Sequence, residues 1–152
     1  MNLVIANRQR IKRIDTRFLK QVTAATLAEL QISEGDLGIH LVGAREMARV
    51  NWQFLQHEGS TDVITFDHAE GGGTLHGELF ICVEDAIQQA REFKTDWTSE
   101  VIRYVVHGIL HLRGYDDLKP HLRRVMKREE NRLVRLLARK FSFAQLERRA
   151  TI

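Results

Sequence analysis

The stretch from Asp96 to Leu112 limits the fold of this chain more than any other part of the sequence. Its apolar residues recur so often that a helix formed here would be hydrophobic over most of its surface; they are Val101, Ile102, Val105, Val106, Ile109 and Leu110. Such a helix has to be buried by the elements around it. Thr98 or Ser99 is expected to cap its N-terminus, and Gly114 to end it in the left-handed conformation. The sequence therefore predicts a buried central helix.

The rest of the chain alternates between strand-like and helix-like patterns. Short apolar runs predict strands at 2–6, 37–42, 61–66 and 78–83, the last apolar enough for a central position in a sheet. Helical spacing predicts helices at 15–30, 44–55, 84–94 and 118–140. The order β, α, β, α, β, β, α, α, α favours an α+β fold. We expect a small mixed sheet of about four strands packed with about five helices, in a single domain spanning residues 1–152.

Several local features are predicted with these elements. Asp15 or Thr16 should cap the helix at 15–30, Gly35-Asp36 should form a turn, and residues 67–74 should form a flexible loop. The last helix should face inward with its apolar residues, which are Leu122, Val125, Met126, Leu133, Leu136 and Leu137.

Charge is unevenly distributed along the chain. Lys and Arg number 23 against 20 Asp and Glu, a net charge of +3. This excess is too small to establish a polyanionic partner. Basic residues concentrate at residues 8–20 and 119–149, however, and the middle is more acidic. The two basic ends would form either a positive face or ordinary solvated helix surfaces.

Cysteine usage and hydropathy indicate a cytoplasmic protein. Cys82 is the single cysteine, so no intramolecular disulfide forms, and its apolar neighbours predict a buried thiol. No apolar run approaches the roughly 18 residues of a membrane span. The apolar N-terminus is too short for a secretory signal. We therefore expect no membrane partner.

Two histidines on the predicted central helix form a candidate metal site. His107 and His111 are four residues apart, which brings both imidazoles to one face of the helix. Gly114 then turns the chain back, and Asp117 follows as a third candidate ligand. Three protein ligands leave one position open for water, as in catalytic zinc sites. Manganese, nickel or iron would also fit these ligands. The alternative is a histidine pair whose nitrogens bind backbone groups or water.

At this point the sequence resembles a known family. Residues 107–117 read His-Gly-Ile-Leu-His-Leu-Arg-Gly-Tyr-Asp-Asp. They are similar to the YbeY signature His-Gly-x-Leu-His-Leu-x-Gly-Tyr-Asp-His and differ only at its last position. Residues 60–66 and 77–82 resemble two strands of the same family, and the similarity extends over nearly the whole chain.

Two positions depart from the family pattern. Asp117 stands where the family usually has histidine, and it would add negative charge beside the ion and make a bound water less acidic. His121, beyond Pro120, is the alternative third ligand. Leu55 stands where the family often has an arginine that is thought to help at the active site, so that contribution would come from elsewhere or be absent.

The resemblance implies a function. It implies a single-strand-specific metallo-endoribonuclease with one Zn²⁺, acting on rRNA in 16S rRNA 3′ end maturation and in ribosome quality control. The ribosome and RNA would then be the partners. No general base is evident; Asp116 and Asp62 are the first candidates, followed by His68 and His76. Arg113 and Lys119 are candidates for phosphate contacts.

Two other functions remain as alternatives. Zincin metalloproteases also have two histidines four apart, but a glutamate follows the first one as general base. Gly108 occupies that position here, which argues against a protease. The other alternative is a non-catalytic ribosome-assembly or RNA-binding factor with a structural metal, which the basic termini and the two departures favour. The oligomeric state, the RNA site cleaved and the physiological metal do not follow from the sequence.

Overall fold

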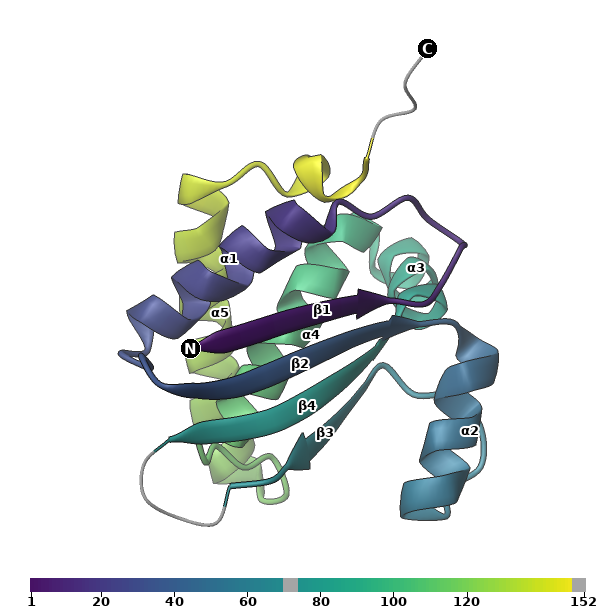
Figure 1. Cartoon of the computed structure of the whole chain (residues 1–152), viewed down its shortest axis with the longest axis horizontal. Coiled ribbons are helices and arrows are strands. Elements are labelled where there is room, and N and C mark those ends of the chain that lie inside the picture. The colour runs from purple at the N-terminus through teal and green to yellow at the C-terminus, as the bar shows by residue number, and fades with distance from the viewer. Residues whose placement is uncertain (70–73, 149–152) are drawn as a thin grey trace.

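The structure, a computed structural model, describes residues 1–69 and 74–148 and consists of one sheet and its helices (Figure 1). Within these residues the elements follow the order β1 (Asn2–Asn7), α1 (Thr16–Glu29), β2 (Gly35–Val42), α2 (Ala44–Leu55), β3 (Val63–Asp67), β4 (Leu75–Cys82), α3 (Val83–Phe93), α4 (Trp97–Leu112), α5 (Pro120–Lys140) and a short 3-10 turn, Phe143–Leu146. The α+β prediction is confirmed. Residues 70–73 of the predicted loop and the basic Arg149 lie outside the described residues.

The four strands form a mixed sheet in the order β1-β2-β4-β3. The first three are parallel, and β3 runs antiparallel to β4 at the edge. β4 is therefore an interior strand, as its apolar sequence predicted. The predicted turn at Gly35-Asp36 is wrong, because both residues belong to β2. A side chain at position 35 would collide with the Leu75 carbonyl, only 1.9 Å from the Cβ position, so glycine lets the two strands pair there.

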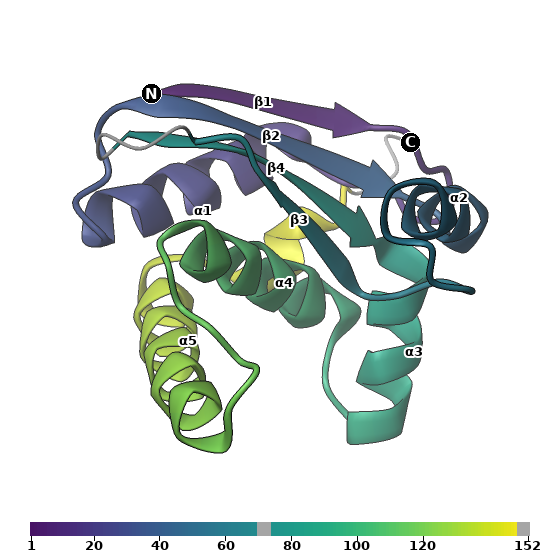
Figure 2. The ribbon, with the colours of Figure 1, turned by 90° about the horizontal axis from the view of Figure 1, so that it is seen from below.

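α4 is the central helix of the layer that covers one face of the sheet (Figure 2). Ile102, Ile109 and Leu110 on this helix are fully buried against the sheet and the other helices. Gly108 allows the close approach, since a Cβ there would lie 2.6 Å from the Leu79 side chain of β4. The prediction of a buried central helix is confirmed. Each fully buried aliphatic side chain of this kind stabilises the fold by roughly 1.5–3 kcal/mol.

The helix ends agree only in part with the sequence. Asp15 caps α1, because its carboxylate accepts a hydrogen bond from the Phe18 N–H at 3.0 Å, as predicted. Gly114 has φ +104° and ends α4, also as predicted. The prediction that Thr98 or Ser99 caps α4 is wrong: Asp96 is the N-cap residue, and Thr98 lies inside the helix with its side chain buried.

α5 packs across α4 with most of the predicted face, since Met126, Leu133 and Leu137 are buried. Val125 was expected to face inward, but it is 48% exposed. The buried face contains instead a carboxylate, Glu130, which is 2% exposed. Its partners lie on α4 and on α5 itself, and belong to the site described below.

Cys82 is buried at the end of β4, as predicted, and burial raises the pKa of its thiol. No helix among residues 1–69 and 74–148 has both the length and the apolar character needed to cross a membrane.

Candidate metal centre

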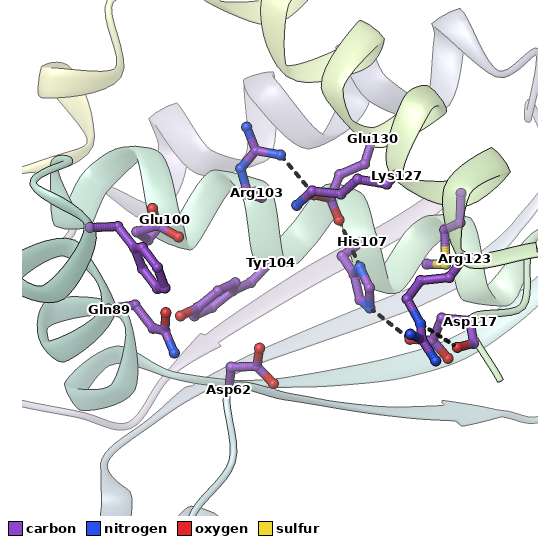
Figure 3. A pocket seen from close by; sticks show the side chains of 12 residues that line it. Asp62, Gln89, Glu100, Arg103, Tyr104, His107, Asp117, Arg123, Lys127 and Glu130 are labelled. Carbon is purple, nitrogen blue, oxygen red and sulfur yellow. Dashed lines mark hydrogen bonds and ion pairs between the residues drawn. The ribbon is translucent and has the colours of Figure 1, made fainter. Parts of the chain in front are cut away.

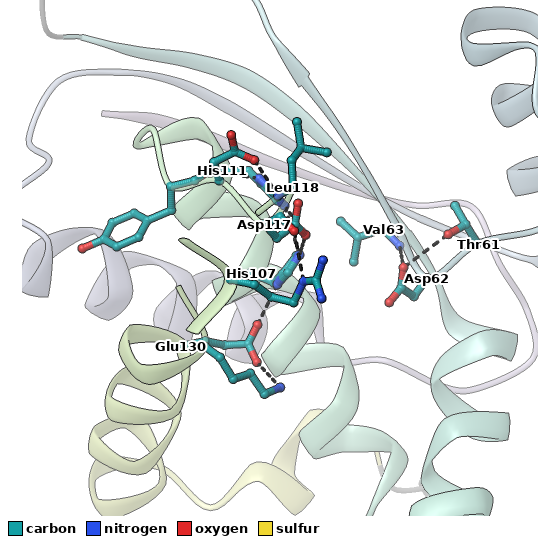
Figure 4. A network of polar contacts seen from close by, with 12 residues as sticks. Thr61, Asp62, Val63, His107, His111, Asp117, Leu118 and Glu130 are labelled. Carbon is teal, nitrogen blue, oxygen red and sulfur yellow. Dashed lines mark hydrogen bonds and ion pairs between the residues drawn. The ribbon is translucent and has the colours of Figure 1, made fainter. Parts of the chain in front are cut away.

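Three side chains converge at the C-terminal end of α4 (Figure 4). The Nε2 atoms of His107 and His111 lie 3.1 Å apart. Asp117, from the loop between α4 and α5, places its Oδ2 atom 3.7 Å from Nε2 of His107 and 3.4 Å from Nε2 of His111. Among the described residues, only these three form a group whose ligand atoms all lie within 4.8 Å of one another. The structure therefore confirms the candidate metal site at the end of the buried helix.

The other ring nitrogen of each histidine is already engaged. Nδ1 of His107 lies 2.7 Å from the Glu130 carboxylate, and Nδ1 of His111 lies 3.2 Å from the Tyr115 carbonyl oxygen. Both of these oxygens are acceptors, so each Nδ1 donates its proton. In neutral imidazoles the Nε2 atoms then have free lone pairs, and these face each other across 3.1 Å. Two facing lone pairs repel, and a cation between them removes the repulsion.

The spacing of the three ligand atoms fits a zinc ion. Zinc bonds of about 2.0–2.1 Å in tetrahedral geometry separate neighbouring ligand atoms by roughly 3.3 Å. The separations of 3.1, 3.4 and 3.7 Å bracket this value. Nitrogen and carboxylate donors are also the donors that zinc accepts. His107, His111 and Asp117 can therefore hold such an ion without rearrangement of the backbone.

Glu130 is the residue at this centre that the sequence analysis missed. Besides His107, its carboxylate accepts hydrogen bonds from Arg103 at 2.7 Å and from Lys127 at 2.9 Å. Burial alone would raise the pKa of this carboxyl group, but the hydrogen bonds from His107, Lys127 and Arg103 lower it to about 2. Glu130 is therefore ionised, and it fixes the orientation and tautomer of His107, as second carboxylates do at many zinc sites.

The candidate centre lies between two pockets. One pocket, of about 460 Å³, lies between α3, α4 and α5, and His107 and Asp117 line it (Figure 3). The other, of about 550 Å³, lies toward β3 and the end of α2, and all three ligands line it. Asp62 lines both pockets, and Leu55 lines the second. A substrate therefore has access to the ligands from two sides.

The other candidate residues from this part of the sequence line neither of the two pockets. Asp116 accepts a hydrogen bond from the Leu118 N–H at 2.8 Å, and it lines neither pocket. Arg113 and Lys119 are exposed and also line neither pocket. His121, the alternative ligand, is exposed and is not part of the three-residue group.

Two further histidines line neither pocket. His68 and His76 lie on the opposite face of the sheet, where they pair with Glu78 and Asp36 respectively.

The basic residue that the sequence analysis did not single out is Arg123. It lines the first pocket, and its Nε donates a hydrogen bond to the Asp117 carbonyl oxygen at 3.1 Å.

Comparison with known proteins identifies the family. The family model "Endoribonuclease YbeY" matches residues 4–138. A relative of that name from Parabacteroides distasonis is 40% identical over 103 residues, covering 68% of this chain and 72% of the relative. Another from Bacteroides fragilis is 36% identical over 121 residues, covering 80% and 84%. A solution structure from Thermotoga maritima has a TM-score of 0.66 at 23% identity, covers 92% and 91% of the two chains, and shares the fold.

The family model spans most of the chain, and the relatives exceed 30% identity over at least two thirds of it. The resemblance stated from the sequence is therefore confirmed, and the chain belongs to the YbeY family of metal-dependent endoribonucleases.

Proposed function

We propose that this chain is a zinc-dependent, single-strand-specific endoribonuclease of rRNA. Its role would be 16S rRNA 3′ end maturation and ribosome quality control in the cytoplasm, with RNA and the ribosome as partners. The observation that supports it best is the pair of Nε2 atoms that face each other at 3.1 Å beside the Asp117 carboxylate. The family supports RNA as the substrate class.

The chemistry follows from the ligand set and its surroundings. When bound by His107, His111 and Asp117, zinc supplies a Lewis acid that polarises a phosphoryl oxygen and acidifies water. Glu130 and the Tyr115 carbonyl hold the two imidazoles so that their lone pairs point to one position. The enzyme therefore binds substrate at a centre that is already oriented, which lowers the cost of reaching the transition state.

Asp62 is the preferred group for proton transfer. It lines both pockets beside the ligands, whereas the Asp116 carboxylate is turned to the Leu118 backbone. The Asp62 carboxylate also accepts a hydrogen bond from the Val63 N–H at 2.8 Å, which holds it in place. Substitution of Asp62 by Asn would then lower the cleavage rate by about 10²–10⁴-fold, the usual range for one general acid or base.

Basic residues around the centre would bind the RNA backbone. Arg123 lines the pocket beside His107 and Asp117, and Arg113 and Lys119 lie on the flanking turns. Each phosphate contact with a single strand contributes about 0.7 to the slope of log affinity against log salt. Removal of any one of these cations should reduce that slope, and an affinity that does not respond to salt would contradict the RNA assignment.

One comparison separates the enzyme from the alternative. Zinc content, cleavage of a single-stranded 16S rRNA fragment and affinity for that fragment are measured for wild type and His111→Ala. The enzyme predicts one zinc per chain, and loss of zinc and of cleavage in the variant with RNA affinity retained. The alternative, a non-catalytic ribosome-assembly or RNA-binding factor with a structural metal, predicts no cleavage by either protein and equal RNA affinity. The basic stretches at residues 8–20 and 119–149 are what favours that alternative.

A further inference from the structure

The pocket between α3, α4 and α5 extends well beyond the metal ligands (Figure 3). Arg123 and Asp117 lie at one end of the view, Gln89 lies toward the other, and Tyr104 and Asp62 lie between them. Its volume of about 460 Å³ falls within the range of about 300–1,000 Å³ that is typical of small-ligand sites. The ligands need only one end of this space, so the rest can accept another part of the substrate.

Tyr104 has a hydroxyl group without a partner. The side chain lines the pocket and is 6% exposed, and its oxygen is buried with no hydrogen-bond partner in the described part of the chain. In Figure 3 this hydroxyl points toward Gln89. Burial raises its pKa above the usual tyrosine value, so the group keeps its proton and remains a donor. An unpaired buried donor destabilises the fold, and phenylalanine at this position would avoid that cost.

Two residues of α3 complete the far end of the pocket. Phe93 lines the pocket and is 64% exposed, so a ligand can reach its ring. Gln89 lies one turn earlier on α3, and its amide offers both a donor and an acceptor. An exposed aromatic face beside such groups is the arrangement by which proteins stack a nucleobase and bind its edge.

The basic side chains of the pocket differ in whether they are free to bind a phosphate. Arg103 and Lys127 are both bound to Glu130, which offsets their charge. Arg123 donates only to a backbone carbonyl, through Nε, and has no carboxylate partner among the residues that the structure describes. Its terminal nitrogens can therefore bind a phosphate next to the metal ligands.

We propose that this pocket is a nucleotide subsite. It takes one nucleobase of a single-stranded RNA, stacked on Phe93 and hydrogen-bonded by Gln89 and the Tyr104 hydroxyl, while the phosphate of that nucleotide lies at Arg123. The proposal rests on the RNA substrate proposed above, and it adds a base contact beside the reacting phosphate. An unstacked base can enter the pocket, whereas a base held in a duplex cannot, which would account for a preference for single strands.

The test measures the contribution of the base to binding. Zinc-loaded protein is titrated with UMP, CMP, AMP and GMP, and with ribose 5-phosphate, which has the same phosphate but no base. At least one nucleotide should bind about 5–150-fold more tightly than ribose 5-phosphate, the range for stacking of one base on an aromatic ring. Equal affinity of wild type for all five compounds would overturn the proposal.

Three substitutions and a control locate the effect. Phe93→Ala should bring the ratio of nucleotide to ribose 5-phosphate affinity close to one, and Gln89→Leu should reduce it. Tyr104→Phe should weaken nucleotide binding about 2–10-fold, as expected for one hydrogen bond, without lowering the melting temperature. Trp52→Ala removes an aromatic side chain that is 58% exposed on α2 and should leave the ratio unchanged. Substitutions that weaken both kinds of ligand equally would contradict a base contact.

Cleavage of a single-stranded RNA by the wild type is measured in parallel. Cleavage without any preference for the nucleotides over ribose 5-phosphate would refute the subsite and leave the nuclease intact. A clear preference without cleavage would support the subsite and refute the proposed nuclease. The two failures are therefore distinguishable.

Discussion

The two faces of the sheet both bring imidazoles and carboxylates together, but in different ways. On the face of the sheet opposite α4, here called the open face, Glu78 lies 2.9 Å from Nε2 of both His40 and His68, so each imidazole has a carboxylate of opposite charge when it is protonated. On the helical face, Nε2 of His107 faces Nε2 of His111 at 3.1 Å. The same residue types thus pair Nε2 with a carboxylate at 2.9 Å on one side, whereas on the other side the carboxylate at 2.7 Å binds Nδ1 of His107 and the Nε2 atoms face each other.

The difference shows what makes a metal site out of common residues. At the candidate centre, Glu130 and the Tyr115 carbonyl occupy the Nδ1 atoms, so the Nε2 lone pairs point, together with the Asp117 carboxylate, to one position. On the open face, Glu78 occupies the Nε2 atoms themselves. In this protein, the groups that bind Nδ1 of His107 and His111 are what direct both Nε2 atoms to a common position, as outer-sphere partners do at metal sites.

Loss of one ligand should have the largest effect. His111→Ala removes one of the three donors, and zinc affinity should fall by more than about 100-fold, beyond the usual effect of an outer-sphere partner. Zinc content after dialysis measures this. His40→Ala is the matched control, since it removes an imidazole from the open face and should leave one zinc per chain. Equal zinc loss in both variants would remove the distinction between the faces.

Removal of zinc should have the next largest effect, which is a loss of thermal stability. At a free zinc concentration of about 100 times the dissociation constant, binding stabilises the folded state by about 2.7 kcal/mol. For a chain of this size, that corresponds to a shift in melting temperature of about 5–10 °C. Differential scanning calorimetry with zinc and with a chelator measures the shift. His111→Ala should show none, and a shift of equal size in that variant would place the zinc elsewhere.

Glu130 tests whether the outer carboxylate matters for the ligands. Glu130→Gln keeps an acceptor for Nδ1 of His107 but removes the charge that Arg103 and Lys127 share. Zinc affinity should fall about 10–100-fold. Glu129→Gln, the same change at the neighbouring position, which pairs with Arg132, is the control and should leave affinity unchanged. Circular dichroism confirms that both variants fold, and an unchanged affinity of folded Glu130→Gln would contradict this role.

The grouping of the three candidate ligands could be predicted from the sequence because it depends on local geometry. His107 and His111 are one turn apart on a helix whose apolar character requires burial, and Gly114 returns the chain to bring Asp117 close. Glu130 lies 23 residues from His107 on another helix, so its role depends on how α5 docks onto α4. A signal for it did exist: Glu130 interrupts the apolar face formed by Met126, Leu133 and Leu137, and a carboxylate on such a face needs buried partners.

For the fold, the order of the elements could be predicted from the sequence, whereas contacts between distant segments could not. Apolar runs and helical spacing gave the order of the elements and the interior position of β4, because burial dictates both. The start of β2 at Gly35 was not predictable from composition, since glycine there serves the close approach of the Leu75 backbone rather than a turn. The pocket at Tyr104 was also missed, because it forms only where α3, α4 and α5 meet.

The smallest expected effect belongs to the open face. Hydrogen bonds from His68 and His40 lower the pKa of Glu78, so the folded state favours its ionised form. A lowered pKa stabilises the fold above the usual carboxyl pKa of about 4.3, and this contribution is lost as the pH falls through the lower folded value. Urea unfolding of wild type and Glu78→Gln should differ by about 0.2–1 kcal/mol at pH 6, as for an exposed ion pair, and converge near pH 2. The exposed Glu58→Gln is the control and should match wild type throughout. A difference that grows toward pH 2, or zinc loss in Glu78→Gln, would mean that the open face is not a separate set of ion pairs.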